Sequence, residues 1–318
     1  MTLTQKPQID DRSRAVLRRL ELDVTRRLNG LLQGDYRGLV SGLGSESGEA
    51  RPYAPGDDVR RIDWSITARM QETHVRDTVA DRELETSVLV DVSPSLAFGT
   101  AQRTKAELAL AAVAAIGFLT DRVGNRLRAV ATDGSRIHEF RSGTGRRNLL
   151  ALLNRIHTLS TTPTTMTLPN KHADTVESGP KGSLAEGMHR IAGPQHRGGL
   201  AVVISDLLDE GWEQPLRRVS QRHDTLVIEI VDPRELVLPN VGVIELRDQE
   251  TGAIREIDTR NRKLRQRFAE AGHTRMQDHA DAVRRAGADH LVLRTDRDWV
   301  VDLATFVRHR RRSRRVNR

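Results

Sequence analysis

The amino-acid sequence predicts an α/β fold: a doubly wound, mostly parallel sheet flanked by helices, with an N-terminal helix and a loop or hairpin extension before it. The first observation is a set of short, continuous apolar runs at residues 86–93, 199–206 and 224–232. Such runs are typical of strands buried on both faces of a parallel sheet. The second is that helical segments separate these runs, as connections between parallel strands require. Ligands of such sheets bind beyond the carboxyl ends of the strands, so polar residues there are the candidates for function.

Each element has its own local signal. Apolar side chains recur at steps of three and four over residues 12–33, which predicts an amphipathic helix, and the Gly-, Ser- and Pro-rich stretch 38–58 predicts a loop or short hairpin. The Ala- and Leu-rich stretch 103–120 predicts a second helix. The other predicted elements are strands 126–133 and 136–140, a helix near 146–156, a Thr- and Pro-rich loop at 158–169, helix 182–192, a hairpin of 241–248 and 253–258, helix 260–286, strand 290–295 and helix 299–308.

Composition limits the class of protein. Of the 318 residues, 37% are hydrophobic and 30% charged, which supports a packed core and excludes wholesale disorder. Cysteine is absent, so the chain has no disulfide, no thiolate metal site and no cysteine nucleophile. The longest apolar run, Leu108–Leu119, has twelve residues, whereas a membrane span needs about 18. The N-terminal stretch lacks the apolar core of a secretory signal. We therefore predict a cytoplasmic protein without a transmembrane segment.

The positive charge is concentrated at one end of the chain. The formal net charge is +8, and the last eleven residues, Arg308–Arg318, contain seven arginines and no acid. The rest of the chain is therefore almost neutral. An Arg-rich tail can bind nucleic acid or an anionic lipid surface, or it can be a solvated chain end. Aromatic residues are only 3% of the chain, which offers little platform for stacking bases.

Small oxygen donors follow the first buried strand. Asp91, Ser93 and Ser95 form an Asp-x-Ser-x-Ser pattern, and Asp206 ends a second apolar strand. Carboxylate and hydroxyl oxygens suit a hard cation such as Mg²⁺ or Mn²⁺. Ser183 is a candidate for a further hydroxyl ligand, with the loop 161–167 as the rival source. The same pattern can also be a helix cap or a turn, since Asp and Ser bond to nearby backbone amides.

These residues carry a resemblance to known families. The strand end at Asp91 with Asp206 downstream resembles the metal-ion-dependent adhesion site (MIDAS) of von Willebrand factor A-type domains. The stretch Arg51–Arg69 resembles the signature of the domain-of-unknown-function 58 (DUF58) family. With residues 88–99 and 295–312, the resemblance covers nearly the whole chain from about residue 15. The matching signature residues are Tyr53, Pro55, Gly56, Asp57, Asp58, Arg60, Ile62, Asp63, Trp64, Ala68 and Arg69.

The resemblance implies a von Willebrand A-like domain that acts with a MoxR-type AAA+ ATPase as a chaperone-like pair on client proteins. Two features depart from the family's pattern. Many relatives carry N-terminal membrane helices that are not seen here, and the hydroxyl ligand from the second loop is usually Thr where Ser183 is the candidate.

The signature segment also has a physical interpretation. Pro55 and Gly56 favour a turn, and the acidic residues that follow alternate with arginines, so carboxylate–guanidinium pairs can form. Trp64 would supply a large buried anchor. We expect these contacts to fasten the N-terminal segment to the sheet.

No sequence pattern predicts catalysis. A hydrolase needs a nucleophile with a base, or a metal with an activated water, and the eleven histidines are scattered without a metalloprotease motif. We therefore predict a metal-dependent protein-interaction module that is not an enzyme, with binding through the Arg-rich tail as the alternative. The predicted domains are an N-terminal helix and signature segment at 1–84, a von Willebrand A-like domain at 85–307 and a basic tail at 308–318.

Overall fold

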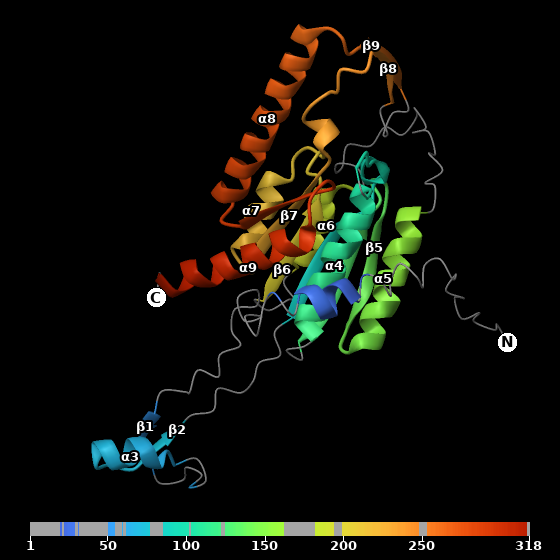
Figure 1. The fold of residues 1–318 in the computed structure, drawn as a ribbon. Coiled ribbons are helices and arrows are strands. Elements are labelled where there is room, and N and C mark those ends of the chain that lie inside the picture. The colour runs from blue at the N-terminus through green and yellow to red at the C-terminus, as the bar shows by residue number, and fades with distance from the viewer. Residues whose placement is uncertain are drawn as a thin grey trace, which may run out of the picture.

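The computed structural model describes residues 20, 22–28, 31, 50–54, 59, 62–76, 85–101, 103–121, 125–161, 182–193, 199–247 and 253–316. Its centre is a six-stranded sheet in the order β10-β7-β6-β3-β4-β5 (Figure 1). Neighbouring strands are parallel except for the edge strand β5, which runs antiparallel to β4. The strands are β3 (Glu85–Asp91), β4 (Arg126–Thr132), β5 (Ile137–Gly143), β6 (Leu200–Ser205), β7 (Asp224–Val231) and β10 (Asp289–Arg294).

Helices cover both faces of this sheet, which confirms the predicted doubly wound α/β fold. Alternate residues of β3 separate the two cores: Val88 and Val90 pack on one side and Leu89 on the other. The first core contains side chains of η1 (Asp23–Leu28), α4 (Lys105–Asp121), α5 (Arg146–Thr161) and α9 (Trp299–Val316). The second contains those of α6 (Leu184–Ile191), α7 (Glu213–Ser220) and α8 (Arg262–Arg285).

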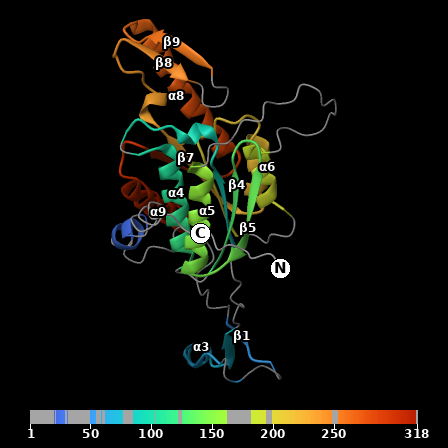
Figure 2. The same cartoon turned by 90° about the vertical axis from the view of Figure 1, so that its right-hand side faces the viewer.

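Most predicted elements lie within a few residues of their observed bounds. The predicted hairpin is present as β8 (Val243–Arg247) paired with β9 (Ile254–Asp258), and it stands beside one end of α8, away from the central sheet (Figures 1 and 2). The predicted loop at 158–169 begins later than expected, because α5 continues to Thr161. The rest of that loop, and most of the predicted N-terminal helix, lie outside the described residues.

The last helix is longer than predicted. The sequence predicts its end at Arg308, but α9 continues to Val316, so the Arg-rich tail is largely helical. Arg310 is almost fully buried, and its guanidinium pairs with Asp224 (2.7 Å) and Asp289 (2.5 Å). Arg308 donates to the carbonyl oxygen of Leu31. At least two arginines of this segment are therefore bound to the rest of the chain.

The family signature forms a small lobe of β1 (Ala50–Pro52), α3 (Trp64–Met70) and β2 (His74–Arg76). Both views place it apart from the central sheet (Figures 1 and 2). Trp64 is 71% exposed and α3 buries none of its residues, so the prediction of a buried indole anchor is wrong. The reason is size: a seven-residue helix over two three-residue strands forms too small a layer to cover an indole.

Other signature residues have local roles in this lobe. The carboxylate of Asp63 caps α3 by accepting from the amides of Ser65 and Ile66. The amide of Tyr53 donates to the carbonyl of Thr73 and closes the lobe, while Arg69 is exposed. The predicted pairs that involve Asp57, Asp58 and Arg60 lie outside the described residues.

None of the helices in the described parts of the chain has the length and apolar character that a bilayer span demands.

Candidate functional site

Three neighbouring parallel strands each lead to a buried aspartate at the same edge of the sheet. Asp91 ends β3, Asp206 follows β6 and Asp232 follows β7, and these strands are adjacent in the sheet. All three residues are buried, with 4%, 5% and 0% of their surface exposed. The carboxyl ends of β3 and β6 thus bring Asp91 and Asp206 together, as the sequence predicted.

Asp91 is held by two hydrogen bonds. Its Oδ1 accepts from the amide of Ser93 (2.8 Å), and its Oδ2 accepts from the hydroxyl of Ser205 (2.7 Å). The hydroxyls of Ser93 and Ser95 are 3.0 Å apart and share one hydrogen bond. The alternative interpretation of this pattern as a turn is correct for the Asp91 carboxylate, because it accepts from the amide of Ser93, two residues later in the chain. The Ser93 hydroxyl, however, makes no cap bond to the short helix η4 (Pro94–Ala97).

The negative charges of Asp91 and Asp206, at the ends of β3 and β6, repel each other. Burial, and then the charge of Asp206, raise the pKa of Asp91 from 3.8 to about 7, although hydrogen bonds from Ser93 and Ser205 oppose the rise. The ionised form of a carboxyl group with this pKa is stabilised by any further cation placed next to it.

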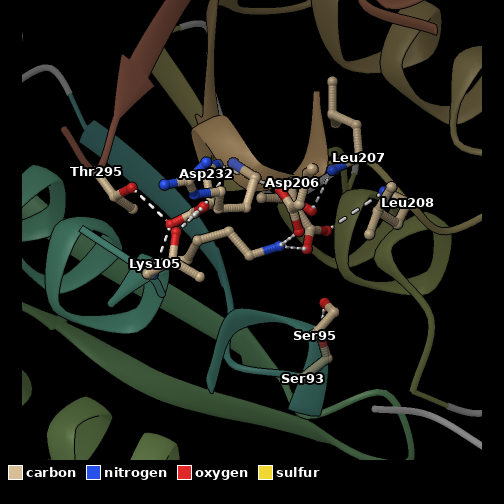
Figure 3. A network of polar contacts seen from close by, with 12 residues as sticks. Ser93, Ser95, Lys105, Asp206, Leu207, Leu208, Asp232 and Thr295 are labelled. Carbon is tan, nitrogen blue, oxygen red and sulfur yellow. Dashed lines mark hydrogen bonds and ion pairs between the residues drawn. The ribbon is translucent and has the colours of Figure 1, made fainter. Parts of the chain in front are cut away.

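Lys105 is the functional side chain that sequence reasoning missed. It lies in the first turn of α4 with none of its surface exposed. Its ammonium contacts Asp206 Oδ2 at 2.8 Å (Figure 3), and it also contacts Glu235 Oε1 at 2.5 Å. Burial alone would lower the pKa of Lys105, but the charges of Asp206 and Glu235 outweigh it and raise that pKa. A lysine just before the Ala- and Leu-rich run of α4 was the available signal.

The side chains at this edge offer carboxylate and hydroxyl oxygens, the donor atoms that a hard divalent cation prefers. The Lys105 ammonium pairs with Asp206 and Glu235, whereas the Asp91 carboxylate is close enough to Asp206 for their charges to repel. These three carboxylates and one ammonium carry a net charge of about −2 when all are ionised. The Ser93 and Ser95 hydroxyls add oxygen ligands of the kind that Mg²⁺ takes. Within the described residues, no group of three or more acidic or histidine side chains is arranged to hold a metal. A cation here would therefore depend on the hydroxyls and on water as well as on carboxylates.

Ser183 precedes α6 and has a local role there. Its hydroxyl accepts from the amide of Glu186 and caps α6. The carbonyl of the preceding Gly182 accepts from the Thr132 hydroxyl, which fixes the start of α6 at the end of β4. None of the contacts described for Ser183 joins it to Asp91, Ser93, Ser95 or Asp206. The rival loop 161–167 lies outside the described residues beyond Thr161, whose hydroxyl bonds the His157 carbonyl.

Asp232 is structural. Its carboxylate accepts from the amide and hydroxyl of Thr100 (2.9 and 2.7 Å), from the hydroxyl of Thr295 (2.7 Å) and from the amide of Arg234 (2.9 Å). Burial would raise the pKa of Asp232, but these hydrogen bonds lower it overall. Figure 3 shows Thr295 and Asp232 on one side of Lys105 and the serines on the other. Asp232 therefore joins strand ends rather than offering free oxygens.

The strand order defines a doubly wound α/β domain, a class in which ligands bind beyond the carboxyl ends of the strands. Residues 49–278 match the family model described as "Protein of unknown function DUF58", and the chain belongs to that family.

Curated relatives agree with this assignment. The chain is 45% identical over 304 residues to "Uncharacterized protein Rv1480" of Mycobacterium tuberculosis (strain ATCC 25618 / H37Rv), an alignment that covers 95% of this chain and 91% of the relative. It is equally similar to "Uncharacterized protein Mb1516" of Mycobacterium bovis, with the same coverage. It is 44% identical over 135 residues to "Uncharacterized protein MAV169" of Mycobacterium avium, covering 42% of this chain and 79% of that one.

Solved structures are more distantly similar. The hypothetical protein BatB from Bacteroides thetaiotaomicron has a TM-score of 0.39 at 14% identity, over 72% of this chain and 99% of its own. The SpRpn10 VWA domain has a TM-score of 0.36 at 12% identity, over 70% of this chain and 94% of its own. These likenesses are weak, and the strand order itself defines the fold.

Proposed function

We propose that this chain is a protein-interaction module that holds Mg²⁺ or Mn²⁺ at the carboxyl edge of its sheet and binds an acidic group of a partner there. The observation that carries the proposal is the pair of buried carboxylates, Asp91 and Asp206, which adjacent parallel strands bring to one edge of the sheet. Ser93 and Ser95 are the first hydroxyl ligands, and Ser183 is a further candidate. A bound divalent cation would supply an open coordination position for a partner carboxylate.

The role is binding rather than catalysis. Asp91 accepts from Ser93 and Ser205, and Asp206 pairs with Lys105, so these contacts fix the orientation of both carboxylates. The partner implied by the family resemblance is a MoxR-type AAA+ ATPase, with the two proteins acting together on client proteins in the cytoplasm.

A pull-down tests this function. The tagged chain is mixed with a purified MoxR-type AAA+ ATPase from the organism that encodes it, without nucleotide, in MgCl₂ or in EDTA. We expect capture in MgCl₂, and at least about a tenfold loss both in EDTA and for Asp91→Ala, because removal of one ligand strongly weakens a metal site. Asp278→Asn, at an exposed site on α8, is the matched control and should bind as the wild type does.

Two results would contradict the proposal. One is equal capture by the wild type and Asp91→Ala. The other is no capture of the ATPase by a chain that does bind an added nucleic-acid probe, with affinity that falls steeply as salt is added, which would favour the Arg-rich tail as the binding element.

A further inference from the structure

Lys105 connects the candidate cation site to a second part of the chain. Its ammonium contacts Asp206, at the end of β6, and also Glu235, the last residue of the short helix η5 (Pro233–Glu235). The side chain of Lys105 is wholly buried, so it makes no contact with solvent. Any change in the charge that faces Asp206 must therefore alter how Lys105 is shared between the two carboxylates.

The helix η5 is in turn fastened to α8. The Glu235 carbonyl accepts from the guanidinium of Arg275 in α8 (3.2 Å). The Glu235 carboxylate also accepts from the amide of Asp232, the N-cap of η5 (3.2 Å), which closes a capping box within η5. Gly272 of α8 passes so close to Leu236 that a Cβ on Gly272 would lie 3.1 Å from the Leu236 Cα. A shift of η5 is therefore transmitted to α8 by direct contact.

The β8–β9 hairpin lies between η5 and α8 in the chain, so both of its ends are attached to these elements. It is a two-stranded ribbon, and such ribbons are only marginally stable by themselves. Val243 and Ile254 are exposed on it, at 49% and 61%. The hairpin is thus the part of this region that responds most readily to a change at η5.

We propose that Lys105 couples the occupancy of the cation site to the hairpin, an inference that rests on the proposed function. Without a divalent cation, Lys105 bridges Asp206 and Glu235 and ties η5 to the sheet. A divalent cation held by Asp91 and Asp206 would repel the Lys105 ammonium from Asp206, and η5 would then lose its tie to β6. The hairpin then opens more often. Linkage requires the converse, so a partner that holds the hairpin open strengthens cation binding by the same factor.

Hydrogen exchange of the full chain, in MgCl₂ and in EDTA, tests the coupling. We expect amide exchange of η5 and β8–β9 to be at least about fivefold faster in MgCl₂, the lower end of usual coupling strengths. Glu235→Gln removes the charged link but leaves Asp91, Ser93, Ser95 and Asp206 in place, so its hairpin should not respond to MgCl₂. Glu270→Gln, at an exposed site on α8, is the matched control and should respond as the wild type does.

A parallel calorimetric titration of MgCl₂ separates the possible failures. If the chain binds Mg²⁺ but exchange of the hairpin is unchanged, the coupling is overturned and the proposed function stands. If Glu235→Gln responds as fully as the wild type, Lys105 is not the link and the proposal is again overturned. If no Mg²⁺ binds, the proposed function fails and the coupling fails with it.

Discussion

Replacement of Lys105 by methionine is expected to lower the free energy of unfolding by about 3–5 kcal/mol, the usual cost of removing one partner from a buried ion pair. The ammonium lies 2.8 Å from Asp206 and 2.5 Å from Glu235, with none of the Lys105 side chain and only 3% of the Asp206 side chain exposed. Methionine keeps an unbranched apolar stem of similar length, so little cavity forms. The fall in the free energy of unfolding therefore measures the removal of the charge. Urea unfolding of both proteins, with EDTA present, measures it.

Two further variants test whether the loss of stability comes from the buried charge. Lys263→Met removes an exposed lysine on α8 and should change stability by no more than about 0.5 kcal/mol. Asp206→Asn added to Lys105→Met should recover part of the loss, because the uncompensated buried charge is then removed. A Lys105→Met protein as stable as the Lys263→Met control would show that the ammonium does not balance this edge of the sheet.

Asp91 is expected to make the metal-free protein less stable as the pH rises. Because the pKa of Asp91 is about 7 in the folded chain and 3.8 for an unperturbed aspartate, folding takes up a proton between these two values. The contribution of Asp91 to stability therefore declines from about pH 4 and levels off above about pH 7. The full difference is up to about 4 kcal/mol, since each pKa unit corresponds to about 1.4 kcal/mol.

Urea unfolding in EDTA at several pH values checks this dependence. Other acids titrate in the same range, so the quantity to follow is the difference between the wild type and Asp91→Asn, which keeps the shape and removes the ionisation. That difference should grow in favour of Asp91→Asn as the pH rises. The exposed-site variant Asp278→Asn should follow the wild type at every pH. Parallel curves for the wild type and Asp91→Asn would contradict the raised pKa.

Sequence reasoning predicted the sheet and the first half of the site because both depend on local patterns. Continuous apolar runs identified the strands that lead to Asp91 and Asp206, and adjacent parallel strands bring their carboxyl ends together. The Asp-x-Ser-x-Ser pattern was visible in the same way.

The rest of the site depends on contacts between residues far apart in the chain. Lys105 and Glu235 are 130 residues apart, and Ser205 reaches Asp91 across 114 residues, so no spacing rule joins them. The exposure of Trp64 was missed for a related reason, because burial depends on how much structure packs over a residue and not on its type.

Cation binding at Asp91 and Asp206 is the central claim, and calorimetric titration of MgCl₂ into the EDTA-treated chain at about pH 8 tests it most directly. We predict one binding event for the wild type, and for Asp91→Asn an affinity at least about tenfold lower. Identical heats for the two proteins, or no heat for the wild type, would contradict cation binding at this site.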